Sequence, residues 1–333
     1  MDKIVFFEVE KWEEDYIKNS FSGYSPVFSP EKLTKENTAN FADSNIVSTF
    51  IYSTVDKEVL ESLPNLKMIS TRSMGYDHID TAFCKEKGIT VSYVPSYGSY
   101  TVAEHAFALI LAISRKIIPS VEQAKKGDFS SANLQGFDLH GKTLGVIGAG
   151  HIGTNVVKLG RAFGMKVLIF SRHKDEELAK DPDIQFVDLD TVLSSSDIVT
   201  LHVPHTPETE HMINMGNIEK FKKSAILINT ARGALVETQA IVEGLDRGIL
   251  QAAGLDVLEE ENDLKEEREL LSSEYLSKVD LKTTLLNHVL LTRDSVVLTP
   301  HNAFNSKEAV EEILETTIAN IKEFSAGTPQ NTV

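Results

Sequence analysis

The stretch GVIGAGHIGTNVVKLGRAFGMKVLIFSRHK, residues 145–174, decides the fold of this chain. Its first residues complete the apolar run TLGVI, which predicts a buried strand, and three spaced glycines follow: Gly148, Gly150 and Gly153. A segment of helical length then leads into a second apolar run, KVLIF. A glycine-rich turn between a buried strand and a helix is typical of a Rossmann unit that binds a dinucleotide. This context makes a ligand-free glycine turn the weaker alternative.

Each glycine of this turn has its own physical role. Gly148 permits the tight turn after the strand, Gly150 lets the backbone approach a pyrophosphate, and Gly153 lets the helix lie close to the sheet. At the start of the helix, the free N–H groups of residues such as His151 and Ile152 and the positive end of the helix dipole favour a phosphate.

The second strand ends without the acid that would accept hydrogen bonds from an adenosine ribose. The residues that follow it are Ser171, Arg172, His173 and Lys174. A serine does not repel a 2′-phosphate, and an arginine can bind it bidentately. Since one charged hydrogen bond contributes about 1.5–3 kcal/mol, the sequence favours NADP(H). If Arg172 points into solvent or stacks on the adenine, NAD(H) stays usable.

Short apolar runs separated by segments of helical length recur along the chain. They are apolar on both faces, as parallel strands covered by helices must be, so the fold class is α/β with doubly wound parallel sheets. The runs lie at 3–9, 45–51, 66–72 and 89–94, and again at 143–147, 166–170, 197–203, 225–230, 252–257 and 296–300.

Two sheets are expected, one from the strands before about residue 95 and one from 143 to 300. The segment 101–117 lies between them, and it predicts a buried helix because it is apolar nearly all round. An amphipathic helix at 306–324 can return to the first sheet. The acidic stretch 259–292 is too long for an ordinary loop and predicts a helical insertion.

Composition excludes several function classes. The 333-residue chain is long enough for two domains, and its formal net charge of −16 repels phosphate backbones and anionic lipid. No nucleic-acid, membrane or metal partner is expected. The single cysteine, Cys84, fits a reducing cytoplasm and predicts a packed small hydrophobe rather than a nucleophile. The N-terminal residues do not match a signal peptide, and the apolar span 102–113 is too short to cross a bilayer.

Polar residues follow three predicted strands, at the sheet edge where α/β folds bind ligands. NTARGAL supplies Arg232, GLDVLEEEND supplies Asp256 and further acids, and VVLTPHNAF supplies His301. An arginine can hold a carboxylate bidentately, a histidine can exchange a proton near neutral pH, and a carboxylate favours the protonated imidazole. Beside a nicotinamide, this set indicates a reductase. Arg232 as an ion-pair partner and His301 as an ordinary loop residue remain alternatives, and the residues alone do not distinguish among the glutamates 259–261.

The motifs GVIGAGHIG, HVPHTPET, LINTARG, AAGLDV and LTPH follow one another in that order, with VAEHAFALIL ahead of them. This order resembles the D-isomer-specific 2-hydroxyacid dehydrogenase family over almost the whole chain. The resemblance implies a flavodoxin-like substrate domain, residues 1–98 plus 303–333, and an inserted Rossmann nucleotide domain, residues 99–302. It also implies an interdomain cleft that closes on hinges near 96–101 and 301–304, and a homodimer to which the 101–117 helix contributes.

The resemblance also implies roles for individual residues. Arg232 is expected to bind substrate, His301 to be the acid/base, and Glu261, five residues after Asp256, to support it. The remaining nicotinamide-side contacts are expected to be Val102, Val203, Pro204, His205, Thr230, Ala231 and Asp256. The remaining substrate-side contacts are expected to be the N–H groups of Met74 and Gly75 and the side chains of Tyr97 and Phe304.

Tyr97 and Phe304 stand where the D-lactate dehydrogenase branch has substrate-side aromatics, although both can instead be hinge-packing residues. The expected function is therefore reduction of a small 2-oxo acid, pyruvate above all, to the D-2-hydroxy acid. Ser171 departs from that branch, which usually keeps an acid there, and the gap from Glu261 to His301 is long for the family. A glyoxylate/hydroxypyruvate reductase is the second hypothesis. An NAD(P)(H)-sensing, corepressor-like interaction protein is the third.

Overall fold

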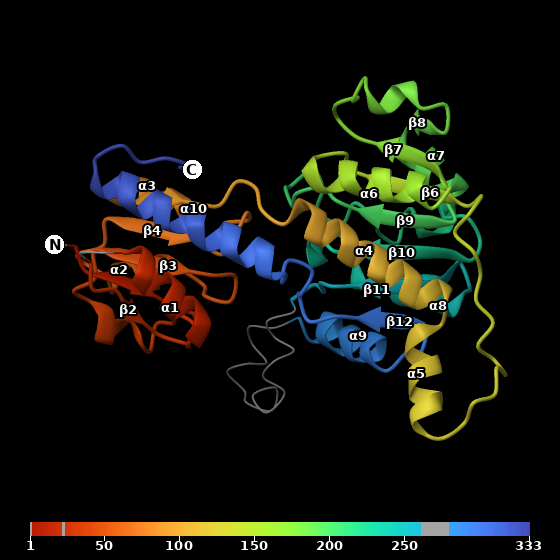
Figure 1. Cartoon of the computed structure of the whole chain (residues 1–333), viewed down its shortest axis with the longest axis horizontal. Helices are drawn as coiled ribbons and strands as arrows, with labels where there is room; N and C mark the ends of the chain where they lie inside the picture. Colours follow the sequence, from red (N-terminus) through yellow and green to blue (C-terminus); the bar gives the residue numbers. More distant parts are fainter. Residues whose placement is uncertain (1, 22–23, 261–279) are drawn as a thin grey trace. The chain divides into compact units, whose positions relative to one another are not determined.

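The computed structural model describes residues 2–21, 24–260 and 280–333. The chain forms two compact units, one of Met1–Gly98 with Asn305–Val333 and one of Ser99–Phe304 (Figure 1). Each unit contains one parallel sheet, so the two expected sheets are confirmed. The chain passes from one unit to the other at 98/99 and at 304/305, which lie within or beside the predicted hinge segments.

The sheet of the first unit has the strand order β2-β1-β3-β4-β5, which is the flavodoxin-like order. Its strands are β1 (Ile4–Phe6), β2 (Val27–Phe28), β3 (Ile46–Thr49), β4 (Met68–Thr71) and β5 (Thr90–Ser92). The four longer strands lie inside predicted apolar runs. β2 was not predicted, because it is only two residues long and exists through its pairing with the edge of β1.

Helices cover both faces of this first sheet. They are α1 (Lys11–Ser20), α2 (Lys57–Glu61), α3 (Thr81–Lys87) and α10 (Lys307–Ser325), with a short 3-10 helix at Thr38–Phe41. Apolar side chains of α2 and α3 share one core with β1, β3 and β4. The C-terminal helix α10 contacts β4 and α1, which confirms that the end of the chain returns to the first sheet.

The sheet of the second unit has the order β12-β11-β10-β9-β6-β7-β8, with all strands parallel. Its strands are β6 (Thr143–Ile147), β7 (Lys166–Phe170), β8 (Ile184–Phe186), β9 (Ile198–Leu201), β10 (Ala225–Asn229), β11 (Leu250–Leu255) and β12 (Val296–Leu298). β8 was not predicted. The strand order reverses between β6 and β9, and such a reversal is where doubly wound folds bind their ligands.

The helices of the second unit are α4 (Ser99–Ser114), α5 (Ile117–Lys125), α6 (His151–Ala162), α7 (Leu189–Ser195), α8 (Thr238–Asp246) and α9 (Leu281–Leu291). Short 3-10 helices lie at Leu178–Lys180, Ile218–Lys220 and Gly233–Leu235. α4 and α6 cover one face of the sheet, and α7 and α8 contribute to the core on the other face. No helix among the described residues is both long and apolar enough to span a membrane.

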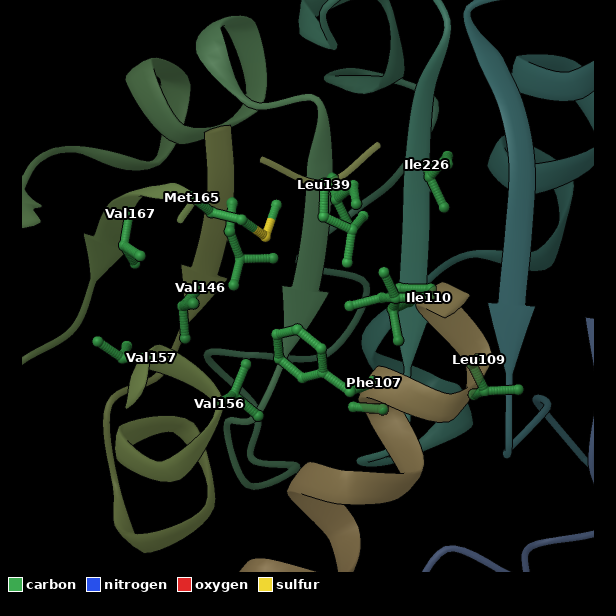
Figure 2. Packing of buried hydrophobic residues seen from close by; sticks show 14 of the residues in the cluster. Phe107, Leu109, Ile110, Leu139, Val146, Val156, Val157, Met165, Val167 and Ile226 are labelled. Carbon is green, nitrogen blue, oxygen red and sulfur yellow. The ribbon is translucent and has the colours of Figure 1, made fainter. Parts of the chain in front are cut away.

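Burial against several elements explains why α4 lacks a polar face. Figure 2 shows Phe107, Leu109 and Ile110 of α4 among buried residues that include Val156 of α6 and Ile226 of β10. α4 also contacts β11 and β12. The predicted burial of the 101–117 segment is therefore correct, although the helix itself spans Ser99–Ser114. In the 259–292 stretch, α9 is the described helix, and residues 261–279 lie outside the described part of the chain.

Candidate functional site

Parallel strands end at the same edge of a sheet, so the predicted segments of the second unit meet at one edge. The glycine turn follows β6, HVP follows β9, and Arg232 follows β10. Asp256 follows β11, and His301 follows β12. Because β12, β11, β10, β9 and β6 are consecutive neighbours in the sheet, this edge carries the glycine turn together with an arginine, a carboxylate and a histidine.

The glycine turn between β6 and α6 is too crowded for side chains at two positions. Gly148 has a φ of +97°, and a Cβ there would lie 2.7 Å from the His202 carbonyl oxygen. A Cβ on Gly153 would lie 1.9 Å from the Gly148 carbonyl oxygen. A Cβ on Gly150, in contrast, would meet no described atom within 4 Å. The backbone at Gly150 is thus open to a close-approaching ligand, which fits a pyrophosphate at the start of α6.

Two alanine substitutions separate packing from ligand approach in this turn. Gly153→Ala is expected to destabilise the protein by ~1–3 kcal/mol, because the new methyl must displace a backbone carbonyl. Gly150→Ala is the matched variant: its φ of −77° suits alanine, so stability should stay within about 0.5 kcal/mol while the nucleotide Kd rises. Urea unfolding and fluorescence titration with NADPH measure the two effects. An equal loss of stability in both variants would contradict this assignment.

The residues after β7 lie beside the glycine turn. The hydroxyl of Ser171 accepts a hydrogen bond from the Ala149 N–H at 3.5 Å, which places this serine next to the loop that follows β6. The three cationic or titratable residues that follow it are exposed: Arg172, His173 and Lys174. A positive, solvent-accessible segment therefore stands where an acid was expected.

The loop after β9 contributes an acid near this segment. The hydrogen bond from Thr206 lowers the pKa of Glu208, and the positive charge of Arg172 lowers it further. Thr209 fixes the loop, because its hydroxyl accepts from the Thr206 N–H at 2.8 Å and donates to the Pro204 carbonyl at 2.7 Å. Of the predicted cofactor contacts in this loop, Val203 is half-buried, and Pro204 and His205 are exposed. Glu208 thus opposes, in part, the positive potential of Arg172.

His202, at the end of β9, was not singled out by the sequence analysis. Its Nε2 lies 2.9 Å from the Thr200 hydroxyl oxygen. Desolvation lowers the pKa of His202 to about 3, so the imidazole is neutral at physiological pH. The signal that could have identified it is its position as the first residue of HVPHTPET, directly after a buried strand.

Asn229, the last residue of β10, sets the backbone that carries Arg232. Its Nδ2 donates to the Arg232 carbonyl at 2.8 Å, and its Oδ1 accepts from the Ala231 N–H at 3.0 Å. Nη1 of Arg232 in turn donates to the Ala231 carbonyl at 2.8 Å. Thr230 is buried, and its hydroxyl has no hydrogen-bond partner among the described residues. Since Asn229 is only 1% exposed, a buried side chain fixes the backbone of this loop.

Asp256 ties the loop after β12 to the end of β11. Its Oδ1 accepts from the Thr299 hydroxyl and from the Asn302 N–H at 2.8 Å, and its Oδ2 accepts from the Ala303 N–H at 2.8 Å. His105 Nε2 lies 3.4 Å from Oδ1. Burial alone would raise the pKa of Asp256, but hydrogen bonds from these four groups outweigh it and hold the pKa below its usual value. The carboxylate is therefore ionised and fully engaged within the protein.

His301 lies in the loop that Asp256 holds. Its φ of +52° is in the left-handed region, which is unfavourable for a residue with a Cβ. Its N–H lies 2.9 Å from the Asp256 carbonyl oxygen and 3.0 Å from the Thr299 carbonyl oxygen. Strained backbone of this kind persists only where the surroundings impose it, and such sites are often functional. Asp256 was predicted to contact the cofactor, and that contact stays a prediction.

The structure shows the hydrogen-bond partners of Glu259, one of the three glutamates at 259–261. Oε1 of Glu259 lies 2.5 Å from His211 Nε2, and its Oε2 accepts from the Thr238 N–H at 2.5 Å and the Thr238 hydroxyl at 2.6 Å. A Cβ on Gly233 would lie 2.0 Å from the Leu258 carbonyl oxygen, so the segment before Glu259 is packed tightly as well. Glu261, the predicted partner of His301, lies outside the described residues.

The predicted substrate-side residues of the first unit follow its strands. Met74 and Gly75 follow β4 after two intervening residues, and Tyr97 follows β5; all three are half-buried. Phe304, the last residue of the second unit, is half-buried, and Val102 on α4 is 8% exposed. That these residues share one ligand with Arg232 stays a prediction.

Two further observations concern the cysteine and the residue types that could bind a metal ion. Cys84 is buried in α3, and desolvation raises its pKa to about 11, so the thiol is protonated and behaves as a packed hydrophobe. No group of three or more His, Cys, Asp or Glu residues suited to a metal ion occurs in the described part of the chain.

Known proteins match this chain over both units. A family model described as "D-isomer specific 2-hydroxyacid dehydrogenase, NAD binding domain" matches residues 107–303. A glyoxylate reductase of Thermococcus litoralis is 34% identical, over 97% of this chain and 88% of the relative. A D-lactate dehydrogenase of Escherichia coli K12 is 31% identical, over 98% of this chain and 97% of the relative. The structure of a D-lactate dehydrogenase from Aquifex aeolicus, complexed with NAD and lactic acid, has a TM-score of 0.85 and 35% identity, and covers 98% of this chain and 96% of its own.

Proposed function

Because the chain belongs to the D-isomer-specific 2-hydroxyacid dehydrogenase family, we propose that it reduces a small 2-oxo acid, pyruvate above all, to the D-2-hydroxy acid. The observation that carries this proposal is the edge of the second sheet, where Arg232 and His301 follow β10 and β12 on either side of Asp256. The glycine turn after β6 lies at the same edge and would hold the nicotinamide dinucleotide. It fits that group because the space beside Gly150 is open.

In the proposed mechanism, Arg232 binds the substrate carboxylate bidentately, and its charge stabilises the negative charge that develops on the C2 carbonyl oxygen. The N–H groups of Met74 and Gly75 bind the same carboxylate. His301 donates a proton to the C2 oxygen, and Glu261 favours the protonated imidazole. When bound, the reduced nicotinamide supplies the hydride that adds to C2. Asp256 keeps the backbone of the histidine loop in place while the proton moves.

The choice of pyruvate rests on Tyr97 and Phe304, the two aromatic residues that match the D-lactate branch. A relative named glyoxylate reductase supports the second candidate, a glyoxylate/hydroxypyruvate reductase. The third candidate, a nucleotide-sensing interaction protein, needs the fold and the glycine turn but neither Arg232 nor His301.

One assay with purified protein separates the three candidates. Consumption of NADPH and NADH is followed with pyruvate, 2-oxobutyrate, glyoxylate and hydroxypyruvate as substrates. The highest kcat/KM with pyruvate supports the proposal, and the highest kcat/KM with glyoxylate or hydroxypyruvate supports the second candidate. Tight nucleotide binding without turnover of any substrate supports the sensor.

We propose NADP(H) as the preferred cofactor, because Ser171 does not repel a 2′-phosphate and Arg172 is exposed beside it. Replacing both residues, as Ser171→Asp with Arg172→Ala, is expected to raise the Kd of NADPH about ten- to hundredfold, since a charged hydrogen bond is lost and a repulsion gained. The Kd of NADH should not rise. Glu208→Gln is expected to act in the opposite direction and strengthen NADPH binding.

The control for this pair is Lys180→Ala, which removes an exposed cation that is paired with Glu177 in the same unit. Fluorescence titration measures each Kd. If the double variant lost affinity for NADPH and NADH equally, this result would show that Arg172 does not bind the 2′-phosphate.

We also propose a cytoplasmic homodimer. The sole cysteine is a free, buried thiol, as suits a reducing compartment. Most apolar side chains of α4 are buried within its own unit, whereas α5 and the residues after it expose large apolar side chains. These are Ile117 (49% exposed), Ile118 (41%), Val121 (47%) and Phe129 (87%). Grouped exposed apolar residues often mark a protein interface, and sedimentation velocity measures the state of assembly.

A further inference from the structure

The segment before the Met74–Gly75 turn is enclosed by the first unit. Thr71, Arg72 and Ser73 are 0%, 1% and 0% exposed, although all three are polar. Buried polar side chains need hydrogen-bond partners, because an unsatisfied group retains the cost of its desolvation. The partners of these three side chains show what the segment does.

The hydroxyl groups of this segment form a chain with a fixed direction. Ser73 Oγ donates to the Gly75 carbonyl oxygen at 2.6 Å. Because a hydroxyl has only one proton, Thr71 is the donor in its 2.6 Å bond to Ser73 Oγ. Thr71 Oγ1 therefore accepts from His78 Nε2, 3.2 Å away, so this nitrogen carries a proton. The donors run from His78 through Thr71 and Ser73 to the carbonyl of Gly75.

Two peptide planes of the turn are anchored through their carbonyl groups. The Ser73 carbonyl accepts from the Val94 N–H at 3.0 Å, and the Gly75 carbonyl accepts from the Ser73 hydroxyl. In a planar trans peptide, the C=O and the following N–H point in opposite directions. The Met74 N–H therefore points away from Val94, and the Tyr76 N–H points away from the Ser73 hydroxyl. The Met74 N–H is thus oriented before any ligand arrives, and the peptide that carries the Gly75 N–H lies between the two anchored planes.

Arg72 holds the other side of this segment. Its Nη2 donates to the Phe7 carbonyl at 2.7 Å and to the Glu8 carbonyl at 2.8 Å, and its Nη1 donates to the Ser48 hydroxyl at 3.2 Å. Its own N–H donates to the Thr49 carbonyl at 2.8 Å. These bonds attach the end of β4 to the ends of β1 and β3. Arg72 therefore fixes the position of the backbone that precedes the turn.

We infer that Ser73 is a positioning residue, which, with Thr71 behind it, holds the Met74–Gly75 turn ready to bind the carboxylate of the substrate. This inference rests on the proposed function, because it assigns the carboxylate site of that reaction. A preoriented turn loses little conformational freedom on binding, so removing its internal hydrogen bond weakens substrate binding without touching the substrate.

The test compares two buried serines of the same unit. Ser73→Ala is expected to raise the KM of the 2-oxo acid about tenfold, the effect of roughly one lost hydrogen bond, while the nucleotide Kd stays at the wild-type value. Thr71→Val should act in the same direction. Ser92→Ala is the matched control: Ser92 is 0% exposed, and its hydroxyl also donates to a backbone carbonyl, that of Gln330, at 3.0 Å. This control should lose stability comparably and keep the wild-type KM.

Hydrogen–deuterium exchange gives a second readout that does not depend on turnover. Ser73→Ala should accelerate exchange in the peptide that covers residues 74–77, and Ser92→Ala should not. If the wild-type protein reduces 2-oxo acids and Ser73→Ala keeps its KM, the positioning role is overturned and the proposed function stands. If the wild-type protein reduces none, the proposed function fails, and the exchange experiment alone decides whether Ser73 holds the turn; equal exchange in both variants overturns that role.

Discussion

Replacing His301 by alanine is expected to lower kcat about 10²- to 10⁴-fold, the range by which a positioned proton donor accelerates a reaction. The variant should still bind NADPH with the wild-type Kd, because the glycine turn after β6 does not depend on this side chain. Steady-state kinetics with pyruvate and fluorescence titration with NADPH measure the two quantities. The expected result is a loss in the chemical step rather than in nucleotide binding.

The control for this experiment is His140→Ala, since His140 is an exposed histidine of the same unit that precedes β6. It should keep the wild-type kcat. His301 has a φ of +52°, so the variant also needs a thermal unfolding curve to show that the loop has kept its fold. Turnover within about twofold of the wild type would remove His301 from the proposed mechanism as the proton donor.

Replacing Arg232 by alanine is expected to lower kcat/KM about 10²- to 10⁴-fold, because two charge-assisted hydrogen bonds of ~1.5–3 kcal/mol each are lost. Arg232→Lys should recover only a small part of this loss, since an ammonium group cannot bind a carboxylate bidentately. The backbone of the loop should hold its position in both variants, because the bonds from Asn229 go to main-chain atoms. Kinetics with pyruvate at saturating NADPH measure the effect.

Arg247→Ala is the matched control, because Arg247 belongs to the same unit and its ion-pair partners among the described residues are Glu219 and Glu243. It should leave kcat/KM unchanged. An Arg232→Ala variant with weakened NADPH binding and an intact KM for pyruvate would place the arginine at the cofactor instead of the substrate.

Most strands were predictable because they depend on local information. A buried parallel strand must be apolar on both faces, and runs such as TLGVI and AILIN show this without knowledge of their neighbours. β2 and β8 were missed for the opposite reason. They have two and three residues, and they exist because they pair with β1 and β7 at the edges of their sheets.

The candidate site was predictable in its residue types but not in its contacts. Arg232 and His301 stand at strand ends in recognisable motifs. The predicted cofactor contact of Asp256 stays a prediction, and the structure adds a role that the sequence did not show: its two carboxylate oxygens hold the loop after β12. Glu259 could not be separated from its neighbours by sequence, whereas its bonds to His211 and Thr238 show that it is engaged elsewhere.

The sequence alone was sufficient to determine the fold class, the glycine turn and the types of residue that carry the chemistry, because these depend on apolar periodicity and on short spacings along the chain. Only the tertiary structure decided which polar groups are already engaged inside the protein. It showed the neutral His202, the ionised Asp256 and the Ser73 carbonyl that accepts from Val94. The physical reason is that hydrogen bonds and desolvation depend on partners such as Val94 or Thr299, which lie far away in sequence and are brought close only when the sheets form.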